Sequence, residues 1–188
     1  MAELRVWDPF VRAFHWTLVI AFFTAFLSGD DWQAVHVIAG YTVGGLILAR
    51  LVWGFVGTRH ARFSDFLYHP SEIRTYLREL LTFSGKRYVG HSPAGGVMIF
   101  ALLFMISLIA VSGLFAYALR EGAGPLAGWI VRDRAMGRFV GEVHEVLADL
   151  TFGLVLVHIA AVLLLSLLHG ENLVKAMWTG RKKAAPSD

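Results

Sequence analysis

Four of the eight histidines in this chain, His15, His36, His144 and His158, lie inside long apolar stretches. An ionisable side chain is expensive to place there and marks a candidate functional site. Two neutral imidazoles on opposite sides of a porphyrin give six-coordinate haem iron, which carries electrons. A single histidine in an apolar helix is more often a hydrogen-bonded packing residue. The pattern formed by all four therefore decides between the two interpretations.

The apolar stretches themselves predict an integral membrane protein. Hydrophobic residues make up 56% of the 188 residues and charged residues 16%. A helix needs about 20 apolar residues to cross a bilayer, and runs at residues 11–27, 35–56, 95–119 and 143–168 are of the required length. We therefore expect an all-α fold, with residues 1–188 forming a single domain built on a four-helix bundle in the membrane.

The distribution of positive charge predicts how this bundle is oriented. Short loops rich in Lys and Arg are retained on the cytoplasmic side. Twelve such residues lie in the N-terminal segment, the second loop and the C-terminal tail, against four in the loops of the opposite side. Both termini are therefore expected to be cytoplasmic.

The second loop and the tail carry patterns of their own. Residues 71–83 place Ile73, Tyr76, Leu77, Leu80 and Leu81 at helical spacing, which predicts a helix lying on the inner membrane surface and contacting lipid. Residues 181–188 are predicted to be a disordered tail that begins with three basic residues. The remaining histidines, His60, His69, His91 and His169, are interpreted mostly as surface residues.

Helix geometry and depth in the membrane divide the four histidines of the apolar stretches into two pairs. His144 and His158 are fourteen residues apart, which places them within about 40° of one helix face and about 21 Å apart along the axis. His15, early in a helix that starts in the cytoplasm, reaches the depth of His158 and forms the inner pair with it. His36, early in a helix that starts outside, forms the outer pair with His144. Each pair is predicted to bind one haem iron.

Three glycines support this prediction. Gly40 and Gly44 follow His36 by four and eight residues, and Gly153 lies between the two histidines of the fourth run. A porphyrin needs a flat helix surface at such positions, although close helix packing would place glycine there as well. A zinc site is the competing interpretation for the histidines, and it is disfavoured because zinc uses three or four close ligands whereas the pairs differ in depth.

Short segments along nearly the whole chain carry a family resemblance. In order they are WDPFVRAFHW, VHVIAGYTVGGLILARLVWGF, GHSPAGG, the HE and LVHI of the fourth run, and HGENLVKAMWTG. Together they resemble the prokaryotic cytochrome b-561 family, within the superfamily that includes the cytochrome b subunits of nickel-iron hydrogenases. Members often have Asn at the position of Ser92. The resemblance implies two b haems held by the same histidine pairs, a ubiquinone-type quinone as redox partner, and the inner membrane of a bacterium.

The preferred hypothesis is a di-haem b-type cytochrome acting as a quinone-linked oxidoreductase. It would exchange electrons between the quinone pool and a second partner, either a periplasmic cytochrome or superoxide. The alternative is a haem-carrying membrane anchor subunit of a hydrogenase-like complex, which is not an enzyme by itself. A haem-free transporter is a third possibility. No partner role for nucleic acid is expected.

Two further groups of residues are candidates for the chemistry. Glu145 and Asp149 lie in or close to the fourth run, where an acidic side chain could handle protons beside the quinone, and Glu145 could equally be an interfacial residue. The third loop carries a cluster of cations on the side that normally lacks them, which predicts attraction of an anion such as a haem propionate, an acidic protein or superoxide. Its members are Arg132, Arg134 and Arg138, and nearby acidic residues cancel much of their charge.

Overall fold

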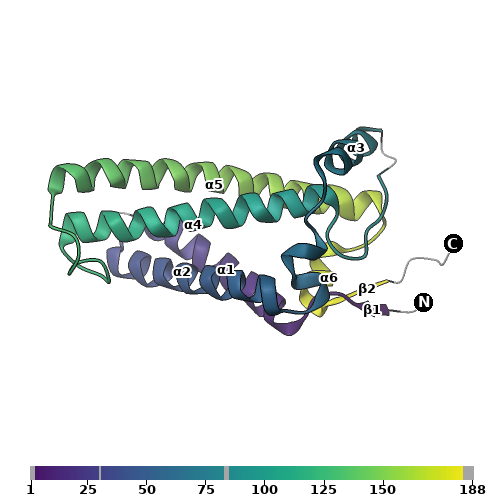
Figure 1. Cartoon of the computed structure of the whole chain (residues 1–188), viewed down its shortest axis with the longest axis horizontal. Coiled ribbons are helices and arrows are strands. Elements are labelled where there is room, and N and C mark those ends of the chain that lie inside the picture. Colours follow the sequence, from purple (N-terminus) through teal and green to yellow (C-terminus); the bar gives the residue numbers. More distant parts are fainter. Residues whose placement is uncertain (1–2, 30, 83–84, 184–188) are drawn as a thin grey trace. The chain divides into compact units, whose positions relative to one another are not determined.

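The computed structural model describes residues 3–29, 31–82 and 85–183. Four helices in it are long and apolar enough to cross a membrane: α1 (Pro9–Ser28), α2 (Gln33–Val56), α4 (Pro93–Glu121) and α5 (Arg134–Leu168). The shorter elements are β1 (Glu3–Arg5), the 3-10 turns η1 (Arg59–Ala61) and η2 (Phe63–Asp65), α3 (Pro70–Leu81), α6 (Leu173–Thr179) and β2 (Arg181–Lys183) (Figure 1). The prediction of an all-α membrane bundle is confirmed.

The predicted runs fall inside the observed helices, and the largest difference is at the start of α5. This helix begins at Arg134, nine residues before the predicted span. Asp133 caps it, because its Oδ1 accepts hydrogen bonds from the backbone N–H groups of Ala135 at 2.9 Å and Met136 at 3.0 Å. Hydropathy marks the lipid-facing part of a helix, whereas the cap marks where the helix begins.

The chain divides into two compact units. Unit 1 contains Met1–Trp16, Ala49–Ala101 and Leu156–Asp188, and unit 2 contains Thr17–Leu48 and Leu102–Val155. Each long helix contributes one segment to each unit. His15 and His158 therefore belong to unit 1, while His36 and His144 belong to unit 2.

In unit 1 the first and last described residues pair as two short antiparallel strands. Glu3 lies opposite Lys183, Leu4 opposite Lys182 and Arg5 opposite Arg181, so both ends of the described chain lie side by side (Figure 1). The prediction of a disordered tail from residue 181 is wrong for Arg181–Lys183, because β1 supplies backbone partners that the local sequence does not reveal. Residues 184–188 of that predicted tail lie outside the described residues.

The predicted surface helix is present as α3 in unit 1. Pro70 occupies its first turn, and the Glu72 carboxylate accepts a hydrogen bond from the backbone N–H of His69 at 2.8 Å. Tyr76 is buried, while Leu77 and Leu81 are exposed. The described helix ends at Leu81, and residue 83 of the predicted range lies outside the described residues. That the exposed leucines contact lipid remains a prediction.

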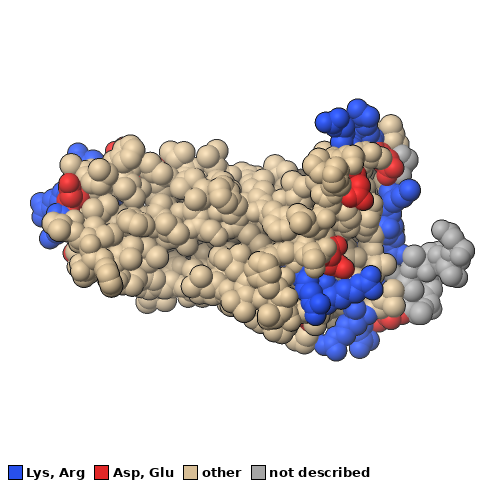
Figure 2. Space-filling view, in the orientation of Figure 1, with Lys and Arg blue, Asp and Glu red and all other residues tan. Residues whose placement is uncertain are grey.

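Charged side chains gather at the loops of each unit. In unit 1 the Lys and Arg side chains lie around α3, α6 and the strands, and in unit 2 they lie around the loop between α4 and α5 (Figure 2). The helical surfaces seen in this view carry other residues. A charge-free helical surface is what hydrocarbon requires.

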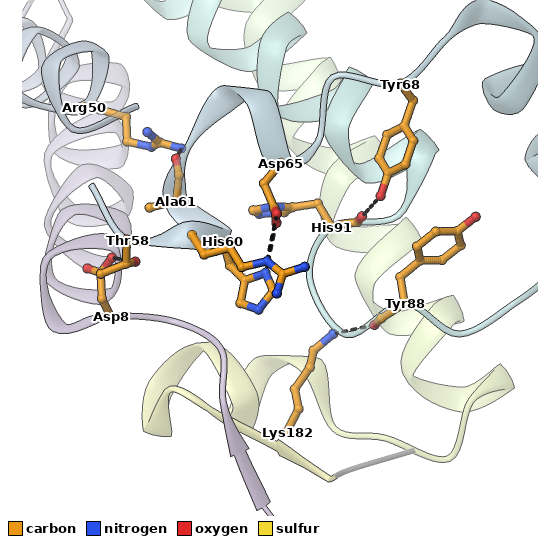
Figure 3. A network of polar contacts seen from close by, with 11 residues as sticks. Asp8, Arg50, Thr58, His60, Ala61, Asp65, Tyr68, Tyr88, His91 and Lys182 are labelled. Atoms are coloured by element: carbon orange, nitrogen blue, oxygen red, sulfur yellow. Dashed lines mark hydrogen bonds and ion pairs between the residues drawn. The ribbon is translucent and has the colours of Figure 1, made fainter. Parts of the chain in front are cut away.

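A buried aspartate ties the start of α1 to the end of α2 in unit 1. Asp8 accepts hydrogen bonds from the backbone of Val11 at 2.9 Å, from the indole of Trp53 at 3.1 Å and from the hydroxyl of Thr58 at 2.6 Å (Figure 3). Burial raises the pKa of Asp8, but the hydrogen bonds from Thr58, Val11 and Trp53 outweigh it and lower the pKa below its ordinary value. The carboxylate therefore stays charged and acts as a structural link.

Replacing this carboxylate should destabilise the protein. Asp8→Ala leaves the Trp53 and Thr58 donors without an acceptor, so we expect the free energy of unfolding to fall by about 1–3 kcal/mol. Denaturant unfolding in detergent, followed by tryptophan fluorescence, measures the change. Asp31→Ala is the matched control because Asp31 is exposed. Equal stability of the two variants would contradict the proposed link.

Candidate functional site

The outer pair lies in unit 2, where α2 and α5 bring two imidazoles close together. The ring centroids of His36 and His144 are 5.9 Å apart, and the ring planes are 80° apart. Two imidazoles bound to one metal ion from opposite sides have centroids about 6 Å apart, because each metal–nitrogen bond is about 2 Å long. The observed separation therefore leaves room for one metal ion between the rings.

Hydrogen bonds fix which nitrogen each ring presents. His36 Nδ1 lies 2.9 Å from the carbonyl oxygen of Ala25, and His144 Nδ1 lies 3.1 Å from the carbonyl oxygen of Ile109. A carbonyl oxygen can only accept, so both Nδ1 atoms carry the proton and donate. The Nε2 lone pair of each ring is then free to bind a metal ion, which is the arrangement found in metal-ligating histidines.

A hydroxyl and a glycine of α4 complete the surroundings of His144. Ser112 Oγ lies 3.1 Å from His144 Nδ1 and also donates to the carbonyl of Ile109 at 3.0 Å. A Cβ atom at Gly113 would lie only 3.0 Å from His144 Cε1, so any larger residue there would crowd the imidazole. Sequence reasoning missed both residues, because the third run holds no histidine. The Ser112–Gly113 step within an apolar run was the available signal.

The inner pair lies in unit 1. His15 on α1 is near enough to His158 on α5 for the two imidazoles to interact electrostatically. Nδ1 of His15 is buried and has no hydrogen-bond partner within the described part of the chain, and its ring packs edge-on against Trp16 with centroids 5.0 Å apart. A buried nitrogen without a partner is rare in folded proteins and calls for an explanation; binding of a cofactor at His15 remains a prediction.

The predicted glycines lie beside open space. A Cβ atom at Gly40 or Gly153 would meet no neighbour within 4 Å, and one at Gly44 would meet only the Cβ of Ala110, at 4.0 Å. These positions are therefore not explained by close helix packing within the described residues. Their contact with a cofactor remains a prediction.

The predicted acidic and cationic residues are all exposed. Glu145 and Asp149 lie on the surface of α5, and among the described residues no hydrogen bond or ion pair links them to another side chain. The three cations of the loop between α4 and α5, Arg132, Arg134 and Arg138, are exposed as well. Arg132 Nε donates to the carbonyl of Arg120 at 2.8 Å. The structure brings none of these five residues into contact with a histidine pair.

No group of three His, Cys, Asp or Glu side chains in the described ranges could hold a metal ion. A metal ion held by only two of these histidines would need further ligands from another source. Iron in a porphyrin meets this requirement, because the macrocycle supplies four nitrogens and the protein supplies the axial ligands.

His91, interpreted from sequence as a surface residue, is instead half-buried in unit 1. It packs between the rings of Trp7 and Phe66, with centroids 4.5 Å away in each case, and its Nδ1 is buried. Burial lowers the pKa of His91 to about 3, helped by the positive charges of Arg50 and Lys182. The surface interpretation is wrong here because the loops before α4 fold over the helix ends of unit 1.

Comparison with known proteins identifies similar chains. A family model described as prokaryotic cytochrome b561 matches residues 6–180. Two similar proteins are named probable Ni/Fe-hydrogenase B-type cytochrome subunit. The one from Rhizobium leguminosarum is 24% identical, over 96% of this chain and 89% of the relative, and the one from Azotobacter vinelandii is 28% identical, over 77% of this chain and 65% of the relative. A third, from Bradyrhizobium diazoefficiens, has the same name and is 23% identical, over 95% of this chain and 85% of the relative. No solved structure matches.

The glycine behind His144 provides a test of the outer pair. In Gly113→Ala the new methyl group would push the imidazole by a few tenths of an ångström, so we expect less haem per chain in a pyridine-haem assay. Gly45→Ala is the control, because a Cβ there meets nothing within 4 Å and Gly45 lies about half a turn out of phase with His36. Full haem content in Gly113→Ala would show that the position of His144 does not matter.

Proposed function

The chain belongs to the prokaryotic cytochrome b561 family, and from this premise we propose that it is the haem-carrying membrane subunit of a hydrogenase-like oxidoreductase complex. In this proposal the chain exchanges electrons between its partner and a ubiquinone-type quinone. A b-type cytochrome holds its haem by coordination alone, and the absence of cysteine from the sequence agrees with this. The observation that supports the proposal best is the outer pair, whose two Nδ1–H groups are already anchored to backbone carbonyls.

Each histidine pair would hold one haem b. His36 and His144 would hold one haem, and His15 and His158 would hold the other. Bound in this way, haem iron supplies a reversible one-electron acceptor and donor. The geometry of each pair lies within one compact unit, so each site is built from its own set of neighbours.

The side chains and backbone around the outer pair set the properties of the ligands. The carbonyls of Ala25 and Ile109 hold the Nδ1–H groups, which orients both rings and makes Nε2 more basic. Ser112 adds a polar contact beside His144. These contacts hold both rings in place, so the rings would lose little freedom on binding a metal ion.

The relatives favour a membrane anchor subunit of a larger complex over a self-contained oxidoreductase. Each is named as a cytochrome subunit of a hydrogenase, and none of those names mentions superoxide or a periplasmic cytochrome. We propose that the exposed cations Arg132, Arg134 and Arg138 attract an acidic surface of the partner. We further propose that Glu145 and Asp149 handle protons close to the quinone; both lie on the helix that carries His144.

Removing one ligand should remove one haem. We expect two haems per chain in the parent protein and about one in His158→Ala, because the outer pair does not depend on that residue for its ring contacts. The pyridine-haem assay on purified protein gives the count. His169→Ala is the control, because it removes another histidine near the end of α5. His169 donates to the carbonyl of Gly85 at 3.1 Å. Two haems in His158→Ala would refute the inner pair.

Turnover by the purified chain separates the subunit from a self-contained enzyme. Reconstituted in liposomes with ubiquinol, the chain should show rapid haem reduction but little sustained turnover with superoxide or a soluble cytochrome c as second substrate. The reason is that a subunit needs its own partner to complete the cycle. Absorbance of the haem band and consumption of quinol measure the two rates. Sustained turnover well above that of the His158→Ala and His144→Ala double variant would favour the self-contained oxidoreductase.

A further inference from the structure

A buried arginine in unit 1 has no ion-pair partner among the described residues. Arg50 lies on α2 with only 4% of its surface exposed. One nitrogen, Nη2, donates to the carbonyl of Ala61 at 3.0 Å (Figure 3), and the guanidinium lies 4.9 Å over the ring of Phe63. The other terminal nitrogen, Nη1, is buried and has no hydrogen-bond partner among the residues described. A buried cation is costly unless an anion and a full set of hydrogen bonds compensate it.

The acidic residues of the region are already occupied. Asp8, whose charge reaches Arg50 electrostatically, accepts its three hydrogen bonds from other groups. Asp65 pairs with His60 at 2.9 Å and with Arg59 at 3.5 Å. Within the described ranges, no carboxylate lies at ion-pair distance from Arg50. The guanidinium therefore lacks the partner that its burial requires.

Two more unpartnered donors lie in the same region of unit 1. Arg12 Nε and His91 Nδ1 are both buried without a hydrogen-bond partner in the described part of the chain. His91 contacts the ring of Trp7 and is within electrostatic range of Arg50. Arg12 is one helical turn beyond Asp8, and its backbone N–H donates to the Asp8 carbonyl at 3.2 Å. The donors come from α1, α2 and the loop before α4.

The charges of these donors specify what would bind them. His91 is neutral at physiological pH, because its pKa is lowered to about 3, so it offers an N–H group without charge. Lys182 is committed to Glu171, 3.9 Å away, and Glu171 also binds Arg87 at 2.8 Å. Among the described residues, Arg12 and Arg50 thus remain as guanidinium groups with no carboxylate at ion-pair distance. Planar guanidinium groups bind carboxylates and phosphates best.

The position of Arg12 connects this cluster to the inner pair. Arg12 precedes His15 by three residues on α1, so the two side chains share one face of the helix. A cofactor clamped at His15 would therefore extend along the same face as Arg12. Haem b carries two propionate carboxylates on one edge of its ring, which matches the chemistry of the unpaired guanidinium groups.

We propose that Arg50, together with Arg12 and His91, binds the propionate carboxylates of the haem held by His15 and His158. This inference rests on the proposed function, since it requires a haem at the inner pair. It assigns a role to three residues that neither hold the metal nor contact a histidine ligand through a hydrogen bond. A phospholipid phosphate is the other anion that guanidinium groups could bind, and the experiment separates the two.

The test compares haem b with its dimethyl ester, in which both carboxylates are capped. A chain carrying His36→Ala and His144→Ala, so that only the inner pair remains, is produced without haem and reconstituted with either compound. Transfer of the haem to apomyoglobin then gives the rate of haem loss. With Arg50 present, the ester should leave about tenfold faster than haem b or more, because charge-assisted hydrogen bonds are lost.

Variants of the arginine decide the assignment. In Arg50→Gln, haem b and the ester should leave at similar fast rates and the midpoint potential of the haem should fall, because a positive charge near the iron has been removed. Arg50→Lys should keep part of the difference between the two compounds. Arg74→Gln, at an exposed position of α3, should keep all of it. If Arg50→Gln does not fold, the comparison of the two compounds in the parent background and in Arg50→Lys still decides.

Several outcomes would overturn the inference. Equal rates for haem b and its ester with Arg50 present would show that the carboxylates are not recognised. An undiminished difference in Arg50→Gln would remove Arg50 from the site. If Arg50→Gln no longer co-purifies with phosphatidylglycerol, but haem b still leaves more slowly than the ester, then Arg50 binds a lipid phosphate instead. If the chain carrying His36→Ala and His144→Ala binds no haem, the inner-haem part of the proposed function is overturned as well. If that chain binds haem b and the ester equally well, only this inference is overturned.

Discussion

Everything in this structure depends on the requirement that a polar atom inside a bilayer must have a partner. The hydrocarbon offers no hydrogen bonds, so each nitrogen of a membrane histidine has to be satisfied by protein or by a bound group. In the outer pair the carbonyls of Ala25 and Ile109 satisfy one nitrogen of each ring. The other nitrogen of each ring is then available to a bound group, as it is in metal-ligating histidines.

The same requirement explains how unit 1 holds together. Its loops and strands come from distant parts of the sequence, and buried polar contacts join them: Asp8 links α1 to Trp53 and Thr58, and Glu171 joins Arg87 to Lys182. Such networks specify one arrangement because any other would leave a buried charge unpaired. In the described residues of unit 2, by contrast, the contacts between helices are mainly apolar and aromatic, as between Phe26 and Phe152, whose rings stack 4.6 Å apart.

The sequence was sufficient for the helices and for the nearness of the two histidines in each pair, because both follow from the regular geometry of a helix. That each pair binds haem stays a prediction. Hydropathy located the spans, and the spacing of His144 and His158 assigned a partner to each. The carbonyl partners of His36 and His144, the need for glycine at position 113 and the burial of His91 could not be predicted, since they depend on which helices and loops are neighbours. The start of α5 at Arg134 depends on a cap, which hydropathy does not register, and β2 depends on a strand at the other end of the chain.

The pairing of β1 with β2 also has a consequence for the order of biosynthesis. Glu3–Arg5 must wait for Arg181–Lys183, the last described residues, before the strands can form. All of unit 2, including both outer histidines, is translated by residue 155, before His158 exists. Unit 1, which holds the β1–β2 pair, therefore cannot be completed until the last described residues have been made.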